Sequence, residues 1–455
     1  MKTKIHPILK EIAAIFGSHR QEVYLVGGAV RDLIRGEKPQ DWDLATSARP
    51  EEVIAMFRTS VPRGKVIPTG IKHGTVTVHF KGHALEVTTF RTESDYRDGR
   101  HPDQVYFAAT IEDDLSRRDF TMNAVALPLD GSEAVDPFGG AADIKKHLIR
   151  CVGNPAERFA EDGLRPLRGV RFASQLGFAI DQPTLAAING ALKVTAGVSP
   201  ERVRDELDKI IGSPKPSIAL RLMEETGLLQ LILPELAGCR GIDQKGYHHF
   251  DVLDHSLLAC DYAAKENYPH TVRLAALFHD LGKPSARKPD EDGIWTFHGH
   301  EAISAKMAKA ILGRLRYPNA VIDETVHLIA EHMFHYEENW SDAAVRRFII
   351  RAGEEHLENL YRLRLSDAYG MAGTEPDKKL LLPLISRVDQ IMAGSRAFSL
   401  KDLAITGKDL METGVKPGKT MGIILNELLE TVLDDPAQNT REKLLEIAGN
   451  LNKRY

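Results

Sequence analysis

The chain has 455 residues, of which 43% are hydrophobic and 27% charged, and its net charge is −5. This composition is typical of a globular protein of about three or four domains, and no apolar run approaches the ~20 residues that cross a bilayer. The three cysteines are far apart, which excludes a disulfide scaffold or a cysteine zinc site and predicts a cytoplasmic protein without a membrane partner.

The first elements predict a small mixed sheet. An amphipathic helix is expected over residues 7–16, followed by a strand that ends at Val26. Further strands are expected at Asp41–Leu44, Thr75–Phe80 and Ala84–Phe90, where apolar or β-branched residues alternate with polar ones. These elements favour an α+β head.

A double glycine follows the first strand. Gly27 and Gly28 let the backbone approach a phosphate that a side chain would block. The amides of the helix that begins here, with Arg31 beside them, can bind that phosphate. The alternative is an ordinary turn.

Three carboxylates follow on two of the expected strands. Asp41 and Asp43 are two residues apart, so on a strand they share one face, whereas Trp42 points away. Glu86 is the only carboxylate of its strand and can complete the group. Such carboxylates typically hold Mg²⁺ with nucleotide phosphates. The alternative is two surface aspartates and a solvent-facing glutamate.

A polar stretch without apolar anchors runs from Arg91 to Val105 and predicts a mobile loop. Arg118 and Asp119 come next and can bind a phosphate and a ribose hydroxyl. The alternative is an ion pair that caps the sheet.

A basic segment follows the head. Between Ile144 and Arg171 there are seven lysines and arginines against three acidic residues, which permits RNA binding despite the negative net charge. If Asp162 is an N-cap, Pro166 fits the first turn of a helix that carries Arg165, Arg168 and Arg171. A carboxylate and a guanidinium presented together match the Watson–Crick edge of a base. A salt-bridged surface helix is the alternative.

Four motifs occur here in the order found in the class II tRNA nucleotidyltransferases: Gly27–Asp32, Asp41–Asp43, Arg117–Asn123 and Glu161–Arg165. The first half of the chain thus resembles that family, which holds the CCA-adding enzymes and the bacterial poly(A) polymerases. The resemblance implies a polymerase-β-type nucleotidyltransferase head. It also implies that CTP and ATP supply C, C and A to the tRNA 3′ end without a nucleic-acid template.

The resemblance also implies roles for single residues. Arg118 is expected near the nucleotide and Asp119 near the ribose, and Asp162 with Arg165 is expected to select the base. Arg168 and Arg171 match nucleotide-binding arginines. The segment from Arg91 to Val105 matches a flexible loop of the CCA-adding enzymes, and the helix expected after Ser199 matches the end of the neck.

Histidines gather from about residue 241. His279 and Asp280 are adjacent, with His255 upstream and Asp367 downstream, which resembles the HD phosphohydrolase superfamily. By that resemblance these four residues hold a divalent transition metal, whose bound water becomes a nucleophile. His300 and His332 are candidates for a second metal or for phosphate. The alternative is a structural HD fold without activity.

The last segment, Gly414–Gly422, is a glycine-proline turn with two lysines before a helix. It resembles the tail of CCA-adding enzymes that holds the tRNA elbow, and a plain packing joint is the alternative. Together the motifs predict a head over 1–150, an all-helical neck over 151–240, an HD-containing body over 241–370 and a helical tail over 371–455.

Three other functions share parts of this pattern. A CC-only or A-only adding enzyme shares nearly every motif, and a poly(A) polymerase shares the head. From a different class, the chain can be a metal-dependent HD phosphohydrolase whose head only binds RNA. The intact pair Asp41 and Asp43 argues against the last reading, because a binding module has no use for catalytic carboxylates.

Overall fold

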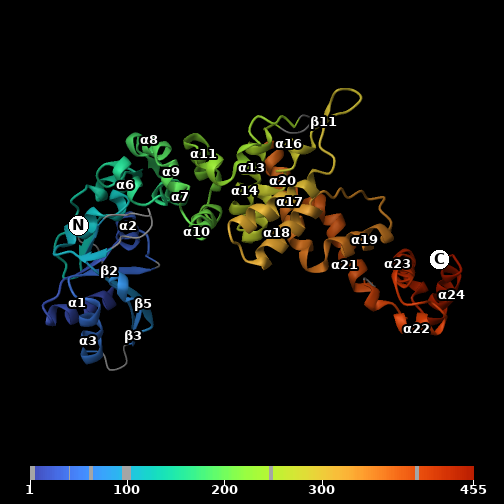
Figure 1. Cartoon of the computed structure of the whole chain (residues 1–455), viewed down its shortest axis with the longest axis horizontal. Coiled ribbons are helices and arrows are strands. Elements are labelled where there is room, and N and C mark those ends of the chain that lie inside the picture. Colours follow the sequence, from blue (N-terminus) through green and yellow to red (C-terminus); the bar gives the residue numbers. More distant parts are fainter. Residues whose placement is uncertain are drawn as a thin grey trace. The chain divides into compact units, whose positions relative to one another are not determined.

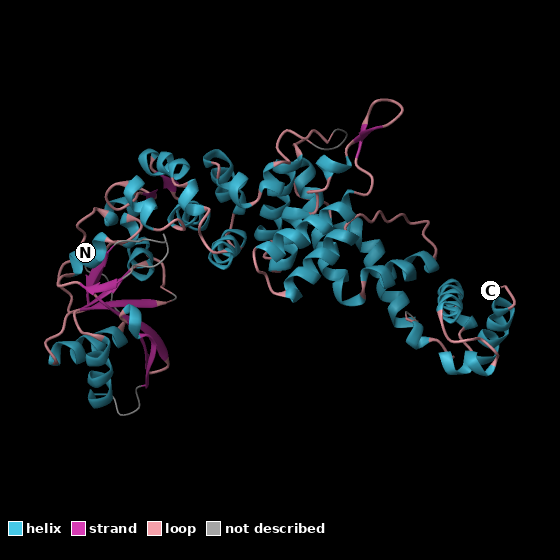
Figure 2. Ribbon diagram, in the orientation of Figure 1, coloured by secondary structure: helices cyan, strands magenta, loops and turns pink. Residues whose placement is uncertain are grey.

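The computed structural model describes residues 6–39, 41–60, 65–94, 104–244, 249–394 and 399–454 (Figures 1 and 2). The chain divides into two compact units, residues 1–238 with 314–316 and residues 239–313 with 317–455. None of the helices in the described ranges is long and apolar enough to span a bilayer.

The main sheet belongs to the first unit and is mixed, as predicted. Strands β2 and β5 are parallel, and the other neighbouring strands are antiparallel. The strand order is β3-β4-β5-β2-β1-β8. The strands are β1 (Val23–Val26), β2 (Trp42–Thr46), β3 (Lys65–Gly70), β4 (Thr75–Phe80), β5 (His83–Thr89) and β8 (Ala126–Pro128).

Short helices surround this sheet. The predicted lead helix is α1 (Pro7–Ser18), whose apolar residues Ile8, Leu9, Ile12 and Phe16 are all buried. The other helices of the head are α2 (Gly28–Arg35), α3 (Pro50–Ser60), α4 (Ile111–Ser116) and α5 (Gly140–Lys145), with short 3₁₀ turns η1 (Ile71–His73) and η2 (Thr121–Asn123).

The segment predicted to be a mobile loop is ordered at both ends. Its first residues form β6 (Arg91–Ser94) and its last residues begin β7 (Gln104–Phe107), and the two strands pair antiparallel. The prediction was wrong there, because backbone pairing orders strands that have few apolar anchors. Residues 95–103 lie outside the described residues.

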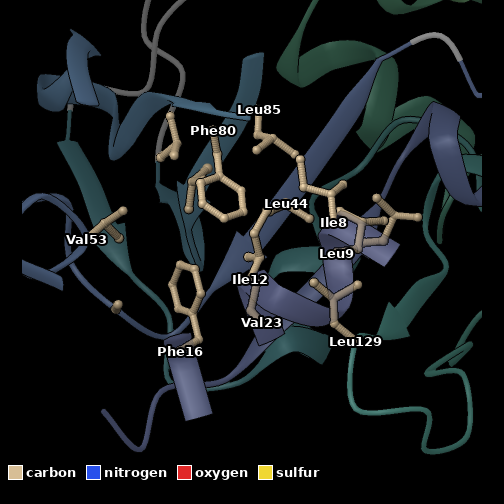
Figure 3. Close-up of a cluster of buried hydrophobic side chains, with 14 of the residues drawn as sticks. Ile8, Leu9, Ile12, Phe16, Val23, Leu44, Val53, Phe80, Leu85 and Leu129 are labelled. Atoms are coloured by element: carbon tan, nitrogen blue, oxygen red, sulfur yellow. The ribbon is translucent and has the colours of Figure 1, made fainter. Parts of the chain in front are cut away.

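The core of the head lies between α1, α3 and the sheet. Figure 3 shows Phe16 and Ile12 of α1 close to Phe80 and Leu44 of the sheet. Leu44 belongs to this cluster and the next residue, Ala45, to a second cluster on the opposite face. The sheet is therefore covered on both faces, and its strands alternate between two cores.

Helices make up most of the rest of the first unit. They are α6 (Pro155–Glu161), α7 (Arg165–Leu176), α8 (Gln182–Gly190), α9 (Leu192–Thr195), α10 (Pro200–Ile211), α11 (Pro216–Thr226), α12 (Leu228–Ile232) and α13 (Pro234–Ala237). The predicted all-helical neck also contains a short strand, β10 (Ala179–Ile180), which pairs in parallel with β9 (Leu148–Ile149).

The second unit is helical apart from a small hairpin, β11 (Lys288–Pro289) and β12 (Trp295–Thr296). Its helices before residue 373 are α14 (Val252–Lys265), α15 (His270–Phe278), α16 (Lys283–Ala286), α17 (His300–Arg314), α18 (Asn319–Glu331), α19 (Asp342–Ala352) and α20 (Leu357–Ala372), with η3 (Glu354–His356). The later helices are α21 (Leu382–Gly394), α22 (Gly407–Glu412), α23 (Lys419–Asp434) and α24 (Arg441–Asn452), with η4 (Lys378–Leu381), η5 (Leu400–Asp402) and η6 (Pro436–Gln438).

Candidate active site

The turn between β1 and α2 requires glycine. Gly27 has φ +67° and ψ −136° and immediately precedes α2. A Cβ at this position would lie 3.3 Å from Nη1 of Arg118 and 3.5 Å from Oδ2 of Asp43. Gly27 and Gly28 line a cleft, so the amides at the start of α2 can face a phosphate there.

Strand alternation brings two of the predicted carboxylates together. Trp42 packs against the core that α1 covers, so Asp43 projects from the other face of β2. Asp43 lies in register beside Glu86 across the parallel strands β2 and β5. Desolvation by the surrounding cleft raises the pKa of Asp43, whose side chain stays open to solvent, the negative charges of Glu86 and Asp41 raise it further, and Arg118 opposes them. A bound cation relieves this repulsion, so the oxygen donors fit Mg²⁺.

Two predicted arginines meet at Asn123. Nη1 of Arg31 donates to the side-chain oxygen of Asn123 at 3.1 Å, and Nη1 of Arg118 donates to its carbonyl oxygen at 3.3 Å. Behind the cleft, the buried carboxylate of Asp114 binds Arg118 at 3.1 Å and Arg117 at 2.8 Å. Burial acts to raise the pKa of Asp114, but both arginines outweigh it and lower that pKa. The arginines are therefore fixed in position.

Asp119 binds an arginine of the neck. Its Oδ2 accepts hydrogen bonds from Nε and Nη2 of Arg168 at 2.8 and 2.6 Å, and its Oδ1 accepts one from Asn123 at 3.1 Å. Burial acts to raise the pKa of Asp119, but the charge of Arg168 and these hydrogen bonds lower it to about 2. Asp119 therefore holds Arg168 at the cleft. The sequence predicted a ribose contact for Asp119 and did not predict this ion pair.

Asp162 lies between two helices and is the C-cap of α6. The predicted N-cap is wrong, because α7 begins at Arg165 and its N-cap is Leu164. Oδ1 of Asp162 accepts a hydrogen bond from the backbone of Leu164 at 3.0 Å. Nη2 of Arg202 donates to both carboxylate oxygens, at 3.1 and 2.8 Å.

Arg165, the expected partner of Asp162 in base selection, is held by protein acceptors. Its Nη1 donates to Glu161 and to the carbonyl oxygen of Arg158, and its Nη2 donates to the carbonyl oxygen of Arg117 at 3.0 Å. The side chain is 8% exposed. Its guanidinium is therefore buried at the edge of the cleft with most of its donors in use.

Gly163 lies just before α7, where the backbone passes close to Val194 of α9. A Cβ there would lie 2.5 Å from the carbonyl oxygen of Val194, a distance that no side chain tolerates. The small residue therefore lets the backbone after Asp162 pack directly on the end of α9.

Arg171, a predicted nucleotide-binding residue, is placed elsewhere. Its guanidinium is buried and binds Glu206 of α10 and Gln175, and it lies over the ring of Phe172. Because Glu206 is itself buried, removing this arginine would leave the buried carboxylate with Lys209, 3.2 Å away, as its remaining ion-pair partner. Arg171 joins α7 to α10 and does not face the cleft.

The predicted residues otherwise converge on one cleft of about 720 Å³. Among its described lining residues are Gly28, Arg31, Asp43, Arg118, Asp119, Asp162, Arg165 and Arg168. Asp41 and Glu86 are not among them. The lining residues that sequence reasoning did not single out include Arg91, Arg117, Asn123 and Arg202. Arg117 and Asn123 carried a signal, because they are the two ends of the motif Arg117–Asn123.

The second predicted site is a buried cluster in the second unit. His255, His279, Asp280 and Asp367 are all buried and come from α14, the end of α15 and α20. Nε2 of His255 lies 3.0 Å from Nε2 of His279, 3.1 Å from Asp280 and 3.3 Å from Asp367. Two overlapping groups have metal-ligand geometry: His255, His279 and Asp367, and His279, Asp280 and His332.

Backbone contacts orient the imidazoles of this cluster. Nδ1 of His279 lies 2.9 Å from the carbonyl oxygen of Ala276, and Nδ1 of His332 lies 2.6 Å from that of Ile329. Because each Nδ1 must donate, each Nε2 presents its lone pair to the cluster, the arrangement of a metal-ligating histidine. The sequence-predicted ligands therefore fit a divalent metal such as a transition ion.

Basic groups border this cluster beside a pocket of about 520 Å³. Nζ of Lys283 lies 2.7 Å from Asp280, and Nη1 of Arg364 lies 2.8 Å from Asp367. His300 also lines the pocket, with its Nε2 3.1 Å from Asp280. The pocket therefore places positive charge next to the predicted metal ligands, as a phosphate site requires.

Family models match three parts of the chain. Residues 23–150 match "Poly A polymerase head domain", residues 177–239 match "Probable RNA and SrmB- binding site of polymerase A", and residues 288–448 match a model of tRNA nucleotidyltransferase domain 2. None of the three is an HD-domain model. The predicted HD resemblance therefore rests on the His/Asp cluster alone.

Relatives and solved structures match nearly the whole chain. A CCA-adding enzyme of Geobacillus stearothermophilus is 35% identical over 428 residues, 94% of this chain and 92% of the relative. One of Latilactobacillus sakei is 35% identical over 97% of this chain and 96% of the relative. The crystal structure of a Bacillus stearothermophilus CCA-adding enzyme in complex with CTP has a TM-score of 0.74 and 32% identity, and 99% of each chain is covered.

Proposed function

The chain belongs to the family of the CCA-adding tRNA nucleotidyltransferases, and on that premise we propose that its cleft adds C, C and A to the 3′ end of tRNA. The observation that carries the proposal is the meeting of Gly28, Asp43 and Asp162 at one cleft. In this proposal Gly28 binds the triphosphate, Asp43 binds the metal ion and Asp162 recognises the base of the nucleoside triphosphate. CTP and ATP are the proposed donors.

The triphosphate is proposed to lie on the turn between β1 and α2. The backbone at Gly27 and Gly28 and the positive end of α2 would bind phosphate oxygens. Arg31 and Arg118 lie beside these glycines and are both hydrogen-bonded to Asn123, so they would add positive charge at the turn. Seven arginines line the cleft, so its field favours a polyanion: Arg31, Arg91, Arg117, Arg118, Arg165, Arg168 and Arg202.

The carboxylates Asp41, Asp43 and Glu86 are proposed to hold Mg²⁺. When bound, the ion stabilises charge on the phosphate oxygens and lowers the pKa of the tRNA 3′-hydroxyl. Asp43 and Glu86 orient this site from adjacent strands. The tRNA 3′-hydroxyl loses its proton to solvent and its oxygen attacks the α-phosphorus; the bond to the β-phosphate oxygen breaks, and pyrophosphate leaves with that electron pair.

Asp162 is proposed to choose the base. Cytosine and adenine each carry an amino group, which donates to a carboxylate, whereas uracil and guanine carry a carbonyl oxygen at the corresponding position. An ionised carboxylate only accepts hydrogen bonds. Asp162 would therefore favour CTP and ATP over UTP and GTP without a nucleic-acid template, with Arg165 as its proposed partner.

The tail is proposed to hold the tRNA elbow. Val415 is buried in an apolar cluster that residues 403–451 form among themselves. Lys416 and Lys419 follow Val415 in the chain and are exposed, and Gly418, with φ +139°, precedes α23. This turn offers backbone amides and two charges to an RNA backbone. In this proposal the head, neck, body and tail keep the boundaries predicted above.

As a second activity, we propose metal-dependent phosphoester hydrolysis at the His/Asp cluster. The supporting observation is that the Nε2 atoms of His255 and His279 lie 3.0 Å apart inside a buried group with two carboxylates. Lys283 and Arg364 would bind the phosphate beside the metal. A bound divalent ion would supply a hydroxide nucleophile near neutral pH.

Two variants separate these activities. Asp41→Ala is expected to abolish incorporation of labelled CMP into a tRNA transcript that lacks CCA, and to leave hydrolysis of p-nitrophenyl phosphate with added Co²⁺, Ni²⁺ or Mn²⁺ intact. His279→Ala is expected to abolish hydrolysis of p-nitrophenyl phosphate and to leave incorporation of CMP intact. If Asp41→Ala incorporates CMP at the wild-type rate, the proposed transferase site is wrong.

A further inference from the structure

We propose that Arg202 is a positioning residue, which fixes the carboxylate of Asp162 for base recognition and thereby sets which nucleotide the cleft accepts. The inference rests on the proposed function of the cleft. It assigns a specificity role to the start of α10, which the sequence alone identifies only as a capped helix.

Asp162 depends on Arg202 for its orientation. The carboxylate makes one hydrogen bond to its own segment, from the backbone of Leu164. Its other contacts both come from Nη2 of Arg202, at 3.1 Å to Oδ1 and 2.8 Å to Oδ2. Because a carboxylate offers about four lone-pair positions, these three contacts leave one for the amino group of a base.

Helix α10 is anchored where it presents Arg202. Glu206 lies one turn further along α10, on the same face, and binds the buried Arg171 of α7. Arg202 and Glu206 therefore bind the two segments that flank the start of α7. This arrangement explains why Arg171 is buried away from the cleft: it holds the helix that carries Arg202.

Arg202 also reaches the cleft itself. It is one of the lining residues, and its side chain is 27% exposed. Its Nη1 is buried and has no hydrogen-bond partner among the described residues. Arg165, by contrast, gives most of its donors to Glu161 and to backbone carbonyls.

The test compares nucleotide selection in the full-length wild type and Arg202→Gln. The ratio of kcat/KM for CTP to kcat/KM for UTP is measured on a tRNA transcript that lacks CCA. Loss of a charge-assisted contact predicts a fall in this ratio of roughly tenfold to a hundredfold, mainly through a higher KM for CTP. Arg202→Lys is expected to restore most of the ratio, because a single nitrogen makes both contacts to Asp162.

The matched control is Arg204→Gln, on the same helix. Arg204 binds Asp205 and the carbonyl oxygen of Arg316 and does not line the cleft, so its removal is expected to leave the ratio unchanged. Thermal unfolding of every variant separates loss of fold from loss of selection. In an Asp162→Asn background, Arg202→Gln should change the ratio little further, since the two residues act as one unit.

Two results would overturn the inference. An unchanged CTP/UTP ratio in Arg202→Gln would show that Asp162 does not need Arg202 for its orientation. An equal fall of this ratio in the wild-type and Asp162→Asn backgrounds would show that Arg202 acts independently of Asp162. A wild-type chain that adds no CMP would instead refute the proposed function, so the two failures are distinguishable.

Discussion

Asp43 and Glu86 lie side by side in register across the parallel strands β2 and β5. Desolvation in the cleft and the charge of Glu86 raise the pKa of Asp43, so the pair carries repulsion that a divalent cation relieves. The geometry of the sheet, with the two carboxylates on one face, therefore creates the proposed magnesium site before any nucleotide arrives.

Removing Glu86 tests this pairing. Glu86→Gln is expected to raise the Mg²⁺ concentration for half-maximal CMP incorporation by at least about tenfold, the effect typical of weakened metal ligation. A magnesium titration of initial rates measures it. The control is Glu11→Gln, which removes an exposed carboxylate that binds Lys81 on the head. Equal magnesium requirements in Glu86→Gln and the wild type would exclude Glu86 from the site.

Gly27→Ala is expected to weaken nucleotide binding and to destabilise the head by about 1–3 kcal/mol. Alanine is strained at φ +67°, and its Cβ would lie 3.3 Å from Arg118. Calorimetric titration with CTP and thermal unfolding measure the two effects. Gly17→Ala is the control, because Gly17 lies within α1 and a Cβ added there would have nothing within 4 Å, so it should keep CTP affinity and gain slight stability. Normal CTP affinity in Gly27→Ala would remove the turn from the proposed phosphate site.

The sequence predicted four of the six strands of the sheet, β1, β2, β4 and β5, because their signals were local, whereas β3 and β8 were not predicted. Alternation in β2 placed Trp42 in the core and Asp43 on the other face, and the predicted strand Thr75–Phe80 is β4 residue for residue. The double glycine likewise predicted a turn that the φ angle of Gly27 now explains. Each of these features depends on residues that are close together in the sequence.

Ion-pair partners could not be predicted in the same way. Arg168 and Arg171 are three residues apart on α7, yet one binds Asp119 of the head and the other Glu206 of α10. Which arginine faces the cleft depends on how α7 packs, and a single sequence holds no record of that packing. Arg202 was missed for the same reason, because its partner is 40 residues away.

Asp119 is expected to contribute to the free energy of unfolding in a pH-dependent way. Its pKa falls from 3.8 to about 2 in the folded chain, so its contribution is complete above pH ~4 and disappears as the pH falls through about 2. Asp119→Asn should therefore cost about 2 kcal/mol at pH 7 and progressively less below pH ~4. Unfolding midpoints across this range measure the difference.

Glu51→Gln, an exposed change on α3, is the control for Asp119→Asn and should shift the midpoint little at any pH. A cost of Asp119→Asn that stays constant from pH 7 to pH 2 would contradict the assigned role of the Arg168 pair.

The His/Asp cluster is expected to bind a metal ion, and this binding should depend on His279. His279 belongs to both ligand groups, so His279→Ala should abolish tight binding of Co²⁺, which visible absorption and elemental analysis detect. His335→Ala removes a histidine that is 79% exposed and should bind the same amount of Co²⁺ as the wild type. Equal binding by His279→Ala and the wild type would make the cluster structural.

The most direct measurement uses three tRNA transcripts, which end before CCA, after its first C and after CC. Each is incubated with the full-length protein, Mg²⁺ and labelled CTP or ATP, and the products are sized on a gel. We expect addition of C, C and then A, after which extension stops. Addition of A only to the CC-ended transcript, an unlimited A ladder, or no incorporation at all would each contradict CCA addition by this chain.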